Sequence, residues 1–327
     1  VIETQFSATE AAIACSIACQ TGLPIAIKDL TPTAGKTTTL GSKVFEHWVP
    51  DHDAPVVERL LAAGAILVGK TTTPEFAHSG FTQSPLWGIS RNPWNPDYAT
   101  GGSSSGSGAA VAAGMVKGAM GSDTGGSIRN PSCLCGIVGI KPTYGLVSRA
   151  GVIANSYTFD HCGPMTWTVE DCAIMLQALA AHDPADPASA NVSVPDYRAA
   201  LTGDIRGLRI GVIRHFWEED QNASDAVRNA MDAALDVLSG LGATIEKTRM
   251  RPMQDYYDVK VTIAESELFA IHADQLRVRP QDFGSDFRGR VLPACLMSGA
   301  DYVSAQRERR TMMAEMAPLY EKYDLLV

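Results

Sequence analysis

The sequence predicts an α/β protein in which a sheet is covered by helices on both faces. Residues 53–64 form a helical pattern, and residues 66–68 follow as a short apolar strand. The same order recurs where a helical pattern that begins at Ser224 is followed by residues 243–245. This alternation is typical of a sheet packed between layers of helices. The 327 residues, 45% of them hydrophobic, can bury one large core or two smaller ones.

The elements of the first half are marked by their caps. Ser7 and Glu10 fit a capping box, which satisfies backbone N–H groups at the start of an Ala/Ile-rich helix. Pro55 suits the first turn of the next helix because its missing N–H is not needed there, and Gly64 ends that helix. Residues 66–68 then predict a buried strand.

Helices and strands also alternate in the second half. Thr168 with Asp171 begins a helix, and residues 185–205 form a connector on the surface. Residues 208–213 predict a buried strand. The helix capped by Ser224 carries apolar residues at helical spacing, namely Val227, Met231, Ala234, Leu238 and Leu241.

Two Gly/Ser-rich turns are the most informative feature of the chain. Residues 101–108 hold the first and residues 121–129 the second, and Ser103 and Ser127 lie 24 positions apart. The segment between the turns, residues 109–114, is so poor in large side chains that a helix made of it can lie very close to its neighbours. We expect this packing to bring both serine turns to one place.

Both turns resemble the motif of the amidase signature family, which reads Gly-Gly-Ser-Ser-Gly-Gly-Ser, an Ala-rich helix and Gly-Ser-Asp-Thr-Gly-Gly-Ser-Ile-Arg. The resemblance extends forward through residues 135–145 and 160–164 and back to residues 24–29. It covers residues 20–250 well and the rest loosely. Ser105 departs from the pattern because the family usually has glycine there. The resemblance implies a large mixed sheet covered by helices on both faces, the amidase signature fold.

The resemblance also implies that Lys28, Ser103 and Ser127 act together on an amide. In this scheme Ser127 attacks the carbonyl carbon, Ser103 relays the proton and neutral Lys28 accepts it. Since a protonated lysine has no lone pair, burial or neighbouring dipoles must depress the pKa of Lys28, and residues 25–27 provide an apolar setting. Each residue alone fits an ordinary surface turn or a solvated charge, but three matching motifs together favour catalysis.

Backbone geometry explains why glycine is suited to the two positions before Ser127. Without side chains, Gly125 and Gly126 let backbone N–H groups turn towards the oxyanion that develops during attack. We therefore expect an oxyanion hole formed by N–H groups near Thr124, Gly125, Gly126 and Ser127. The resemblance further implies a cis peptide bond at Gly102–Ser103.

These features predict an amidase that hydrolyses a non-peptide C–N bond through a serine acyl-enzyme, releasing a carboxylic acid and ammonia or an amine. No cofactor is expected. The family also includes hydrolases of carbamates (urethanes), ureas and hydrazides, and the glutamine-hydrolysing A subunit of an amidotransferase, so these alternatives stay open. A noncatalytic scaffold of the same fold is a further alternative, against which the intact Lys28, Ser103 and Ser127 argue.

Two competing motifs predict other enzymes. The sequence around Ser104 fits the Gly-x-Ser-x-Gly nucleophile elbow, but residues 98–101 before it do not form the buried strand that this elbow requires. Residues 35–37 resemble the end of a phosphate-binding loop, yet Leu30 stands where its first glycine is needed. We reject both.

No metal site is expected. The cysteine pairs at 15/19 and 133/135 lack a second ligand pair, and the seven histidines form no His-Glu-x-x-His pattern. Residues 160–162 have the residue types of a cysteine protease, but consecutive residues cannot all face one site, so a structural segment is expected. Asp123 and Arg129 are expected to form an ion pair that shapes the second serine turn.

Composition excludes several classes of protein. A net charge of −9 and a pI near 5.3 argue against a nonspecific nucleic-acid binder. There is no 18-residue apolar stretch to cross a membrane, and residues 1–5 lack the basic start of a signal peptide. Seven scattered cysteines fit reduced thiols. We expect a cytoplasmic enzyme with a small-molecule amide substrate and no nucleic-acid or membrane partner, and a homodimer stays open.

The whole chain, residues 1–327, is interpreted as a single amidase signature domain that is incomplete at its C terminus, with the N terminus left open. Residues 323–327 resemble a strand that the family continues into a further segment, which helps to form the substrate pocket. Phe81, Trp87 and Trp94 are weak candidates for pocket walls, because large aromatic residues more often serve ordinary packing.

Overall fold

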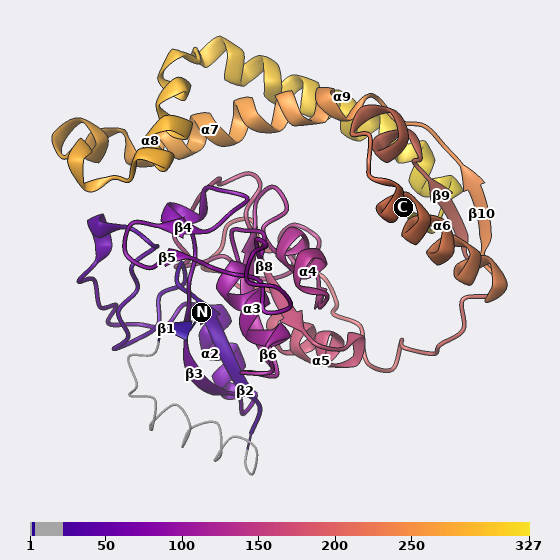
Figure 1. Cartoon of the computed structure of the whole chain (residues 1–327), viewed down its shortest axis with the longest axis horizontal. Coiled ribbons are helices and arrows are strands. Elements are labelled where there is room, and N and C mark those ends of the chain that lie inside the picture. The colour runs from indigo at the N-terminus through magenta and orange to yellow at the C-terminus, as the bar shows by residue number, and fades with distance from the viewer. Residues whose placement is uncertain (1, 4–21) are drawn as a thin grey trace. The chain divides into compact units, whose positions relative to one another are not determined.

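The computed structural model describes residues 2–3 and 22–327 (Figure 1). The predicted capping box at Ser7 and Glu10, together with Cys15 and Cys19, lies outside these residues. The chain divides into two compact units, each of which is described by itself. Unit 1 contains Val1–Leu201 and Glu267–Pro293, and unit 2 contains Thr202–Ser266 and Ala294–Val327.

Unit 1 is built on a mixed sheet, as predicted. Within the described residues its strand order is β1-β3-β2-β6-β8-β7. The strand β2 pairs in parallel with β3 and β6, whereas β8 runs antiparallel to β6 and β7, and β1 runs antiparallel to β3. The bounds are β1 Ile2–Glu3, β2 Pro24–Lys28, β3 Ile66–Thr71, β6 Gly118–Asp123, β7 Val138–Gly139 and β8 His161–Thr166.

Two helices of unit 1 start where their caps predict. Pro55 opens α2 (Pro55–Ala62), and the chain turns at Gly64. The side chain of Thr168 accepts a hydrogen bond from the Asp171 N–H and caps the helix α5. The other elements of unit 1 are α3 Ser105–Ala112, α4 Arg129–Cys135, α5 Val169–Leu179, α8 Ser285–Val291, the short strands β4 Gln83–Ser84 and β5 Gly88–Ile89, and the 3-10 turns Lys43–Phe45, Glu75–Ala77 and Pro280–Asp282. A further 3-10 turn, Leu292–Leu296, begins in unit 1 and ends in unit 2.

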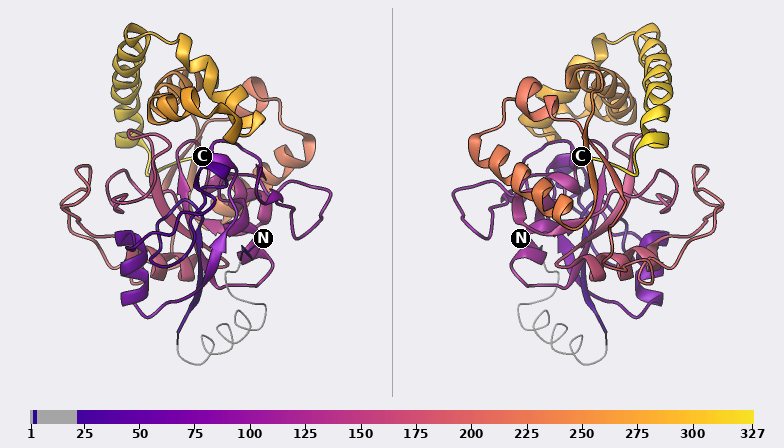
Figure 2. Two further views of the ribbon diagram at one scale, coloured as in Figure 1. Left: turned by 90° about the vertical axis from the view of Figure 1, so that its left-hand side faces the viewer. Right: turned by 90° about the vertical axis from the view of Figure 1, so that its right-hand side faces the viewer.

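Helices cover both faces of this sheet, which confirms the predicted fold class (Figure 2). Successive side chains of a strand point to opposite faces. On β2, Ile25 and Ile27 pack in a cluster with residues of α2 and α5. Ala26 lies between them in sequence and packs in a second cluster with Ala110 and Val111 of α3. Helices therefore pack against β2 on both faces of the sheet.

Unit 2 contains a smaller parallel sheet of order β10-β9-β11. Its strands are β9 Arg209–Val212, β10 Thr244–Lys247 and β11 Leu325–Leu326, and its helical elements are the π-helical turn Phe216–Asp220, α6 Asp225–Gly240, α7 Met253–Val278 and α9 Gly299–Lys322. The side chain of Ser224 caps α6, as predicted. The helix α7 begins in unit 2 and ends in unit 1.

The predicted surface connector and the predicted strand at residues 323–327 are also confirmed. Residues 185–205 contain no helix or strand and are largely exposed, and β11 lies within residues 323–327. Of the helices in the described part of the chain, none combines the length and the apolar character that a membrane span requires.

Candidate active site

Lys28 is a buried lysine at the end of β2. Its side chain has 0% exposure, and its Nζ donates hydrogen bonds to the Ser103 Oγ at 2.6 Å and to the Ser122 Oγ at 2.8 Å. Burial lowers the pKa of Lys28 to about 7, although the negative charge of Asp123 works in the opposite direction. The lowered pKa makes the neutral amine, which can accept a proton, accessible near neutral pH.

The two serine turns meet, as the sequence predicted. The peptide bond between Gly102 and Ser103 is cis, in agreement with the resemblance. The N–H of Ser104 donates to the carbonyl oxygen of Ser127 at 3.1 Å, which joins the first turn to the second. Ser103 is fully buried beside Lys28. Lys28, Ser103 and the Ser127 turn therefore belong to one site.

The helix α3 can hold the first turn in place because it packs directly against β3. A Cβ atom on Gly106 would lie 2.4 Å from the backbone nitrogen of Thr72, a separation that no side chain tolerates. The extra hydroxyl of Ser105 is used within the same contact, since it hydrogen-bonds with the Thr82 hydroxyl and donates to the Thr72 carbonyl at 3.4 Å. In the segment expected to pack closely, residues 109–114, Ala110 and Val111 are buried in a cluster with Ala26 of β2.

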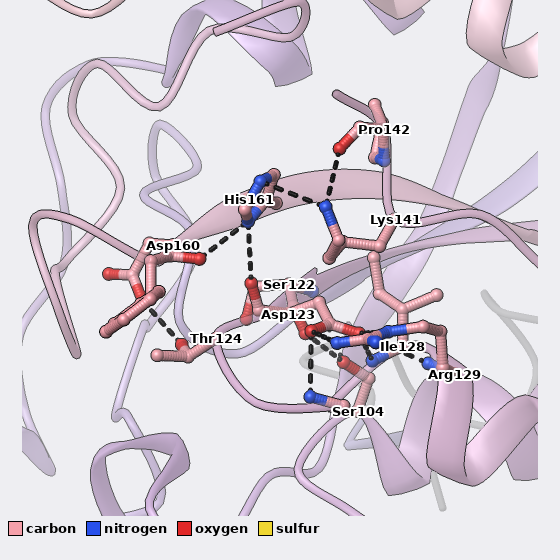
Figure 3. Close-up of polar contacts among 12 residues, drawn as sticks. Ser104, Ser122, Asp123, Thr124, Ile128, Arg129, Lys141, Pro142, Asp160 and His161 are labelled. Carbon is pink, nitrogen blue, oxygen red and sulfur yellow. Dashed lines mark hydrogen bonds and ion pairs between the residues drawn. The ribbon is translucent and has the colours of Figure 1, made fainter. Parts of the chain in front are cut away.

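Asp123 organises the second turn (Figure 3). Its carboxylate has 0% exposure and accepts hydrogen bonds from the N–H groups of Gly126 at 2.8 Å and Ile128 at 3.0 Å. Arg129 completes the pair through its Nε at 3.0 Å and its Nη2 at 2.8 Å. Burial alone would raise the pKa of Asp123, but Arg129 and the N–H donors outweigh it and lower the pKa to about 2. The expected structural ion pair is thus present.

Ser127 lies where this turn leads into α4. It is half-buried, and within the described residues its hydroxyl has no hydrogen-bond partner. Of the four N–H groups expected to form an oxyanion hole, that of Gly126 is directed to Asp123. Those of Thr124, Gly125 and Ser127 have no acceptor in the described part of the chain. Gly126 has φ +122°, which only glycine adopts without strain.

Ser104 is not arranged as a nucleophile. Its hydroxyl donates to the carbonyl of Ser122 at 3.1 Å and accepts from the N–H of Ser122 at 3.2 Å, so both functions of the hydroxyl are occupied by β6 (Figure 3). The residues before it form only an isolated bridge at Ala99 and no strand. Both observations agree with the rejection of the nucleophile elbow.

Residues 160–162 are structural, as expected. Asp160 accepts a hydrogen bond from the Thr124 hydroxyl, and the His161 Nδ1 lies 2.6 Å from the Phe159 carbonyl oxygen (Figure 3). The His161 Nε2 lies 3.1 Å from the Lys141 Nζ, and burial together with this neighbouring charge lowers the pKa of His161. Burial raises the pKa of Cys162 to about 12, so its thiol stays protonated.

Ser122 and the cavity beside it were not predicted from the sequence. The cavity has a volume of about 190 Å³, and its polar lining includes Ser122, Arg149, Tyr157, Asp160 and His161. The signal for Ser122 was its position in the signature one residue before Asp123, at the end of a strand adjacent to β2. The candidate wall residues lie elsewhere: Phe81 is exposed, and the indole N–H groups of Trp87 and Trp94 bond to Thr39 and to the Cys135 carbonyl.

Comparisons with known proteins point in one direction. A family model described as Amidase matches residues 7–327. The A subunit of glutamyl-tRNA(Gln) amidotransferase from Thermosynechococcus vestitus is 41% identical over 331 residues, covering 94% of this chain and 68% of that protein. A chain from a vestigial protein complex, described as revealing the origins of an s-triazine catabolic enzyme, matches with a TM-score of 0.89 at 38% identity, covering 97% of this chain and 70% of that one. The A subunit of glutamyl-tRNA(Gln) amidotransferase from Thermotoga maritima matches with a TM-score of 0.81 at 32% identity, covering 98% and 76%.

Proposed function

The chain belongs to the amidase family, and we propose that it hydrolyses a small non-peptide amide through an acyl-enzyme on Ser127. The products are a carboxylic acid and ammonia or an amine. The observation that carries this proposal is the hydrogen bond of 2.6 Å between the buried Lys28 amine and the Ser103 hydroxyl. The next residue, Ser104, donates its backbone N–H to the carbonyl oxygen of Ser127.

Proton transfer begins at Ser127. As its Oγ attacks the amide carbonyl carbon, its proton passes to Ser103, and Ser103 gives its own proton to neutral Lys28. The burial that lowers the pKa of Lys28 to about 7 makes the neutral amine available near neutral pH. The second contact, with Ser122, holds the amine in place while the proton moves.

The oxyanion of the tetrahedral intermediate is stabilised by backbone N–H groups. Those of Thr124, Gly125 and Ser127 have no other acceptor among the described residues, so they are available to the substrate oxygen. Gly126 contributes in a different way from the one expected, because its N–H binds Asp123 and its positive φ shapes the turn.

Collapse of the intermediate breaks the C–N bond. The proton held on Lys28 returns through Ser103 to the leaving nitrogen, which departs as ammonia or an amine. Water then attacks the ester on Ser127, and its proton passes through Ser103 to Lys28. As the acid is released, this proton returns through Ser103 to the Oγ of Ser127, which restores the free enzyme. The reaction is balanced without any cofactor.

Intact-protein mass spectrometry after rapid quenching tests the acyl-enzyme. With an aryl amide in excess, we expect an adduct of the acyl mass that disappears in Ser127→Ala. The proposal would be contradicted if the product amine were released in one rapid turnover while the enzyme stayed unmodified.

A second candidate function is favoured by the relatives named as A subunits of glutamyl-tRNA(Gln) amidotransferase. In this case the chain hydrolyses glutamine and passes ammonia to a partner protein. Turnover of a substrate panel containing aryl, aliphatic and amino-acid amides, with carbamates and hydrazides, separates the candidates. Strong dependence on glutamine together with a stable partner complex favours the second, and turnover by the chain alone, as monomer or homodimer, favours the first.

We also propose that the enzyme acts in the cytoplasm. The cysteines in the described part of the chain are free thiols, as a reducing compartment allows. Immunolocalisation in the source cell tests this, and a signal outside the cytoplasm would contradict it.

A further inference from the structure

A buried carboxylate holds the first residue of the Ser127 turn. The hydroxyl of Thr124 donates to Asp160 Oδ1 at 2.5 Å (Figure 3). The second oxygen of Asp160 accepts the N–H groups of Asn155 at 2.8 Å and Ser156 at 2.9 Å. Asp160 therefore connects the serine turn to the loop of residues 155–160.

The loop is fixed in turn by Glu267, a residue of α7 with 8% exposure. The hydroxyl of Ser156 donates to Glu267 Oε2 at 2.5 Å. Thr158 donates to the same carboxylate twice, through its N–H at 3.2 Å and its hydroxyl at 3.0 Å. All of these residues lie in unit 1.

The two halves of the Ser127 turn are held by different groups. Asp123 accepts hydrogen bonds from the N–H groups of Gly126, Ile128 and Arg129 and fixes the second half. In the first half, the N–H groups of Thr124 and Gly125 make no hydrogen bond within the described residues, and Gly125 is exposed. The Thr124 hydroxyl is therefore the polar anchor of the half that offers two of the proposed oxyanion donors.

We propose that Asp160 and Glu267 are positioning residues for the oxyanion hole, acting through the hydrogen-bond chain Thr124–Asp160–Ser156–Glu267. The inference rests on the proposed function, because it assigns these side chains to the same turn. A donor displaced by about 1 Å can cost 10²-fold in rate, so a turn without this anchor loses transition-state stabilisation while the nucleophile and the base remain.

The test compares kcat per active site, with sites counted by fluorophosphonate titration so that misfolded protein does not enter the rate. We expect Thr124→Val to lower kcat by ~10²-fold with KM changed by less than about threefold. Thr124→Ser keeps the hydroxyl and should restore kcat to within about threefold of the parent. We expect Glu267→Gln to lower kcat by ~10-fold, because it weakens the chain at its far end.

A double-mutant cycle tests that the residues act as one chain. Asp160→Asn combined with Thr124→Val should be no slower than the slower single variant, whereas independent effects would multiply. Asp183→Asn is the matched control, since Asp183 is a buried carboxylate that accepts a serine hydroxyl and a backbone N–H elsewhere in unit 1. It should lower Tm without lowering kcat per site.

Wild-type kcat in Thr124→Val, or an equal loss of kcat in Asp183→Asn, would overturn this inference. Failure of the proposed function is recognised separately, because in that case Ser127→Ala retains activity and fluorophosphonate does not react with Ser127 in the parent enzyme.

Discussion

The Nζ atom of Lys28 lies 2.6 Å from the Oγ atom of Ser103, and both residues are fully buried. A lysine in this position is only partly protonated near pH 7, because burial lowers its pKa to about 7. The contact therefore makes an ordinarily cationic side chain the base of the proposed reaction.

The pH dependence of kcat/KM follows from this pKa. Protonated Lys28 cannot accept a proton, so activity should be low on the acid side, rise through an apparent pKa of about 7 and level off above it. The value belongs to the coupled site rather than to Lys28 alone. A rate profile with its midpoint near that of free lysine, about 10.4, would show that Lys28 is not desolvated as described.

The closeness of α3 to β3 predicts a steric effect of Gly106→Ala. The new methyl group would meet the Thr72 backbone, so α3 must move and take Ser103 away from Lys28. We expect a loss of about 1–3 kcal/mol in the free energy of unfolding, with a fall in kcat. Gly240→Ala is the control, because a Cβ there meets nothing within 4 Å. Urea unfolding measures both, and equal effects of the two would refute the packing argument.

Removal of Arg129 should destabilise the protein in a pH-dependent manner. Asp123 has its pKa lowered to about 2 in the folded state, so this interaction stabilises the protein above pH ~3.8 and is lost as the pH falls towards 2. Because the Arg129 side chain is 54% exposed, we expect Arg129→Met to cost only about 1–3 kcal/mol at pH 7. Urea unfolding at pH 7 and at about pH 3, which lies between these two pKa values, should show a smaller cost at the lower pH. A cost that grows with acid would contradict the assignment.

Turnover should survive removal of metal ions. The proposed nucleophile and base are a serine and a lysine, and the described residues contain no group of three His, Cys, Asp or Glu side chains able to hold a metal. We expect unchanged kcat after dialysis against EDTA. Loss of activity that zinc restores would require a different mechanism.

The sequence was sufficient to predict features that depend on neighbouring residues. The two serine turns, the capped helices and Lys28 each follow from short-range patterns, and the small side chains of α3 predicted that the turns would meet. The alternation of helices and strands likewise predicted the layers of unit 1.

Contacts between distant segments could not be predicted in this way. Ser122 reaches Lys28 because β6 pairs with β2 in a particular register, and Glu267 reaches Ser156 across 111 positions. The hydrogen bond from the Gly126 N–H to Asp123 was also unforeseen, because a glycine motif indicates freedom of the backbone and not the direction of its N–H groups.

The proposed triad predicts a pattern among substitutions. Ser127→Ala should lower kcat by roughly 10⁴–10⁶-fold, and Ser103→Ala and Lys28→Ala should each lower kcat by nearly as much. Combining these substitutions should lower kcat no further, because the three residues move one proton. Ser104→Ala, which loses only its bonds to β6, should cost ~10–100-fold.

Fluorophosphonate labelling, read by peptide mass spectrometry, tests the central claim most directly. The Ser127 hydroxyl makes no hydrogen bond within the described structure, whereas the Ser104 hydroxyl is bonded to the backbone of β6. We predict one phosphonyl group, on Ser127, and no reaction in Ser127→Ala. A label on Ser104, with Ser127→Ala still active, would contradict the account.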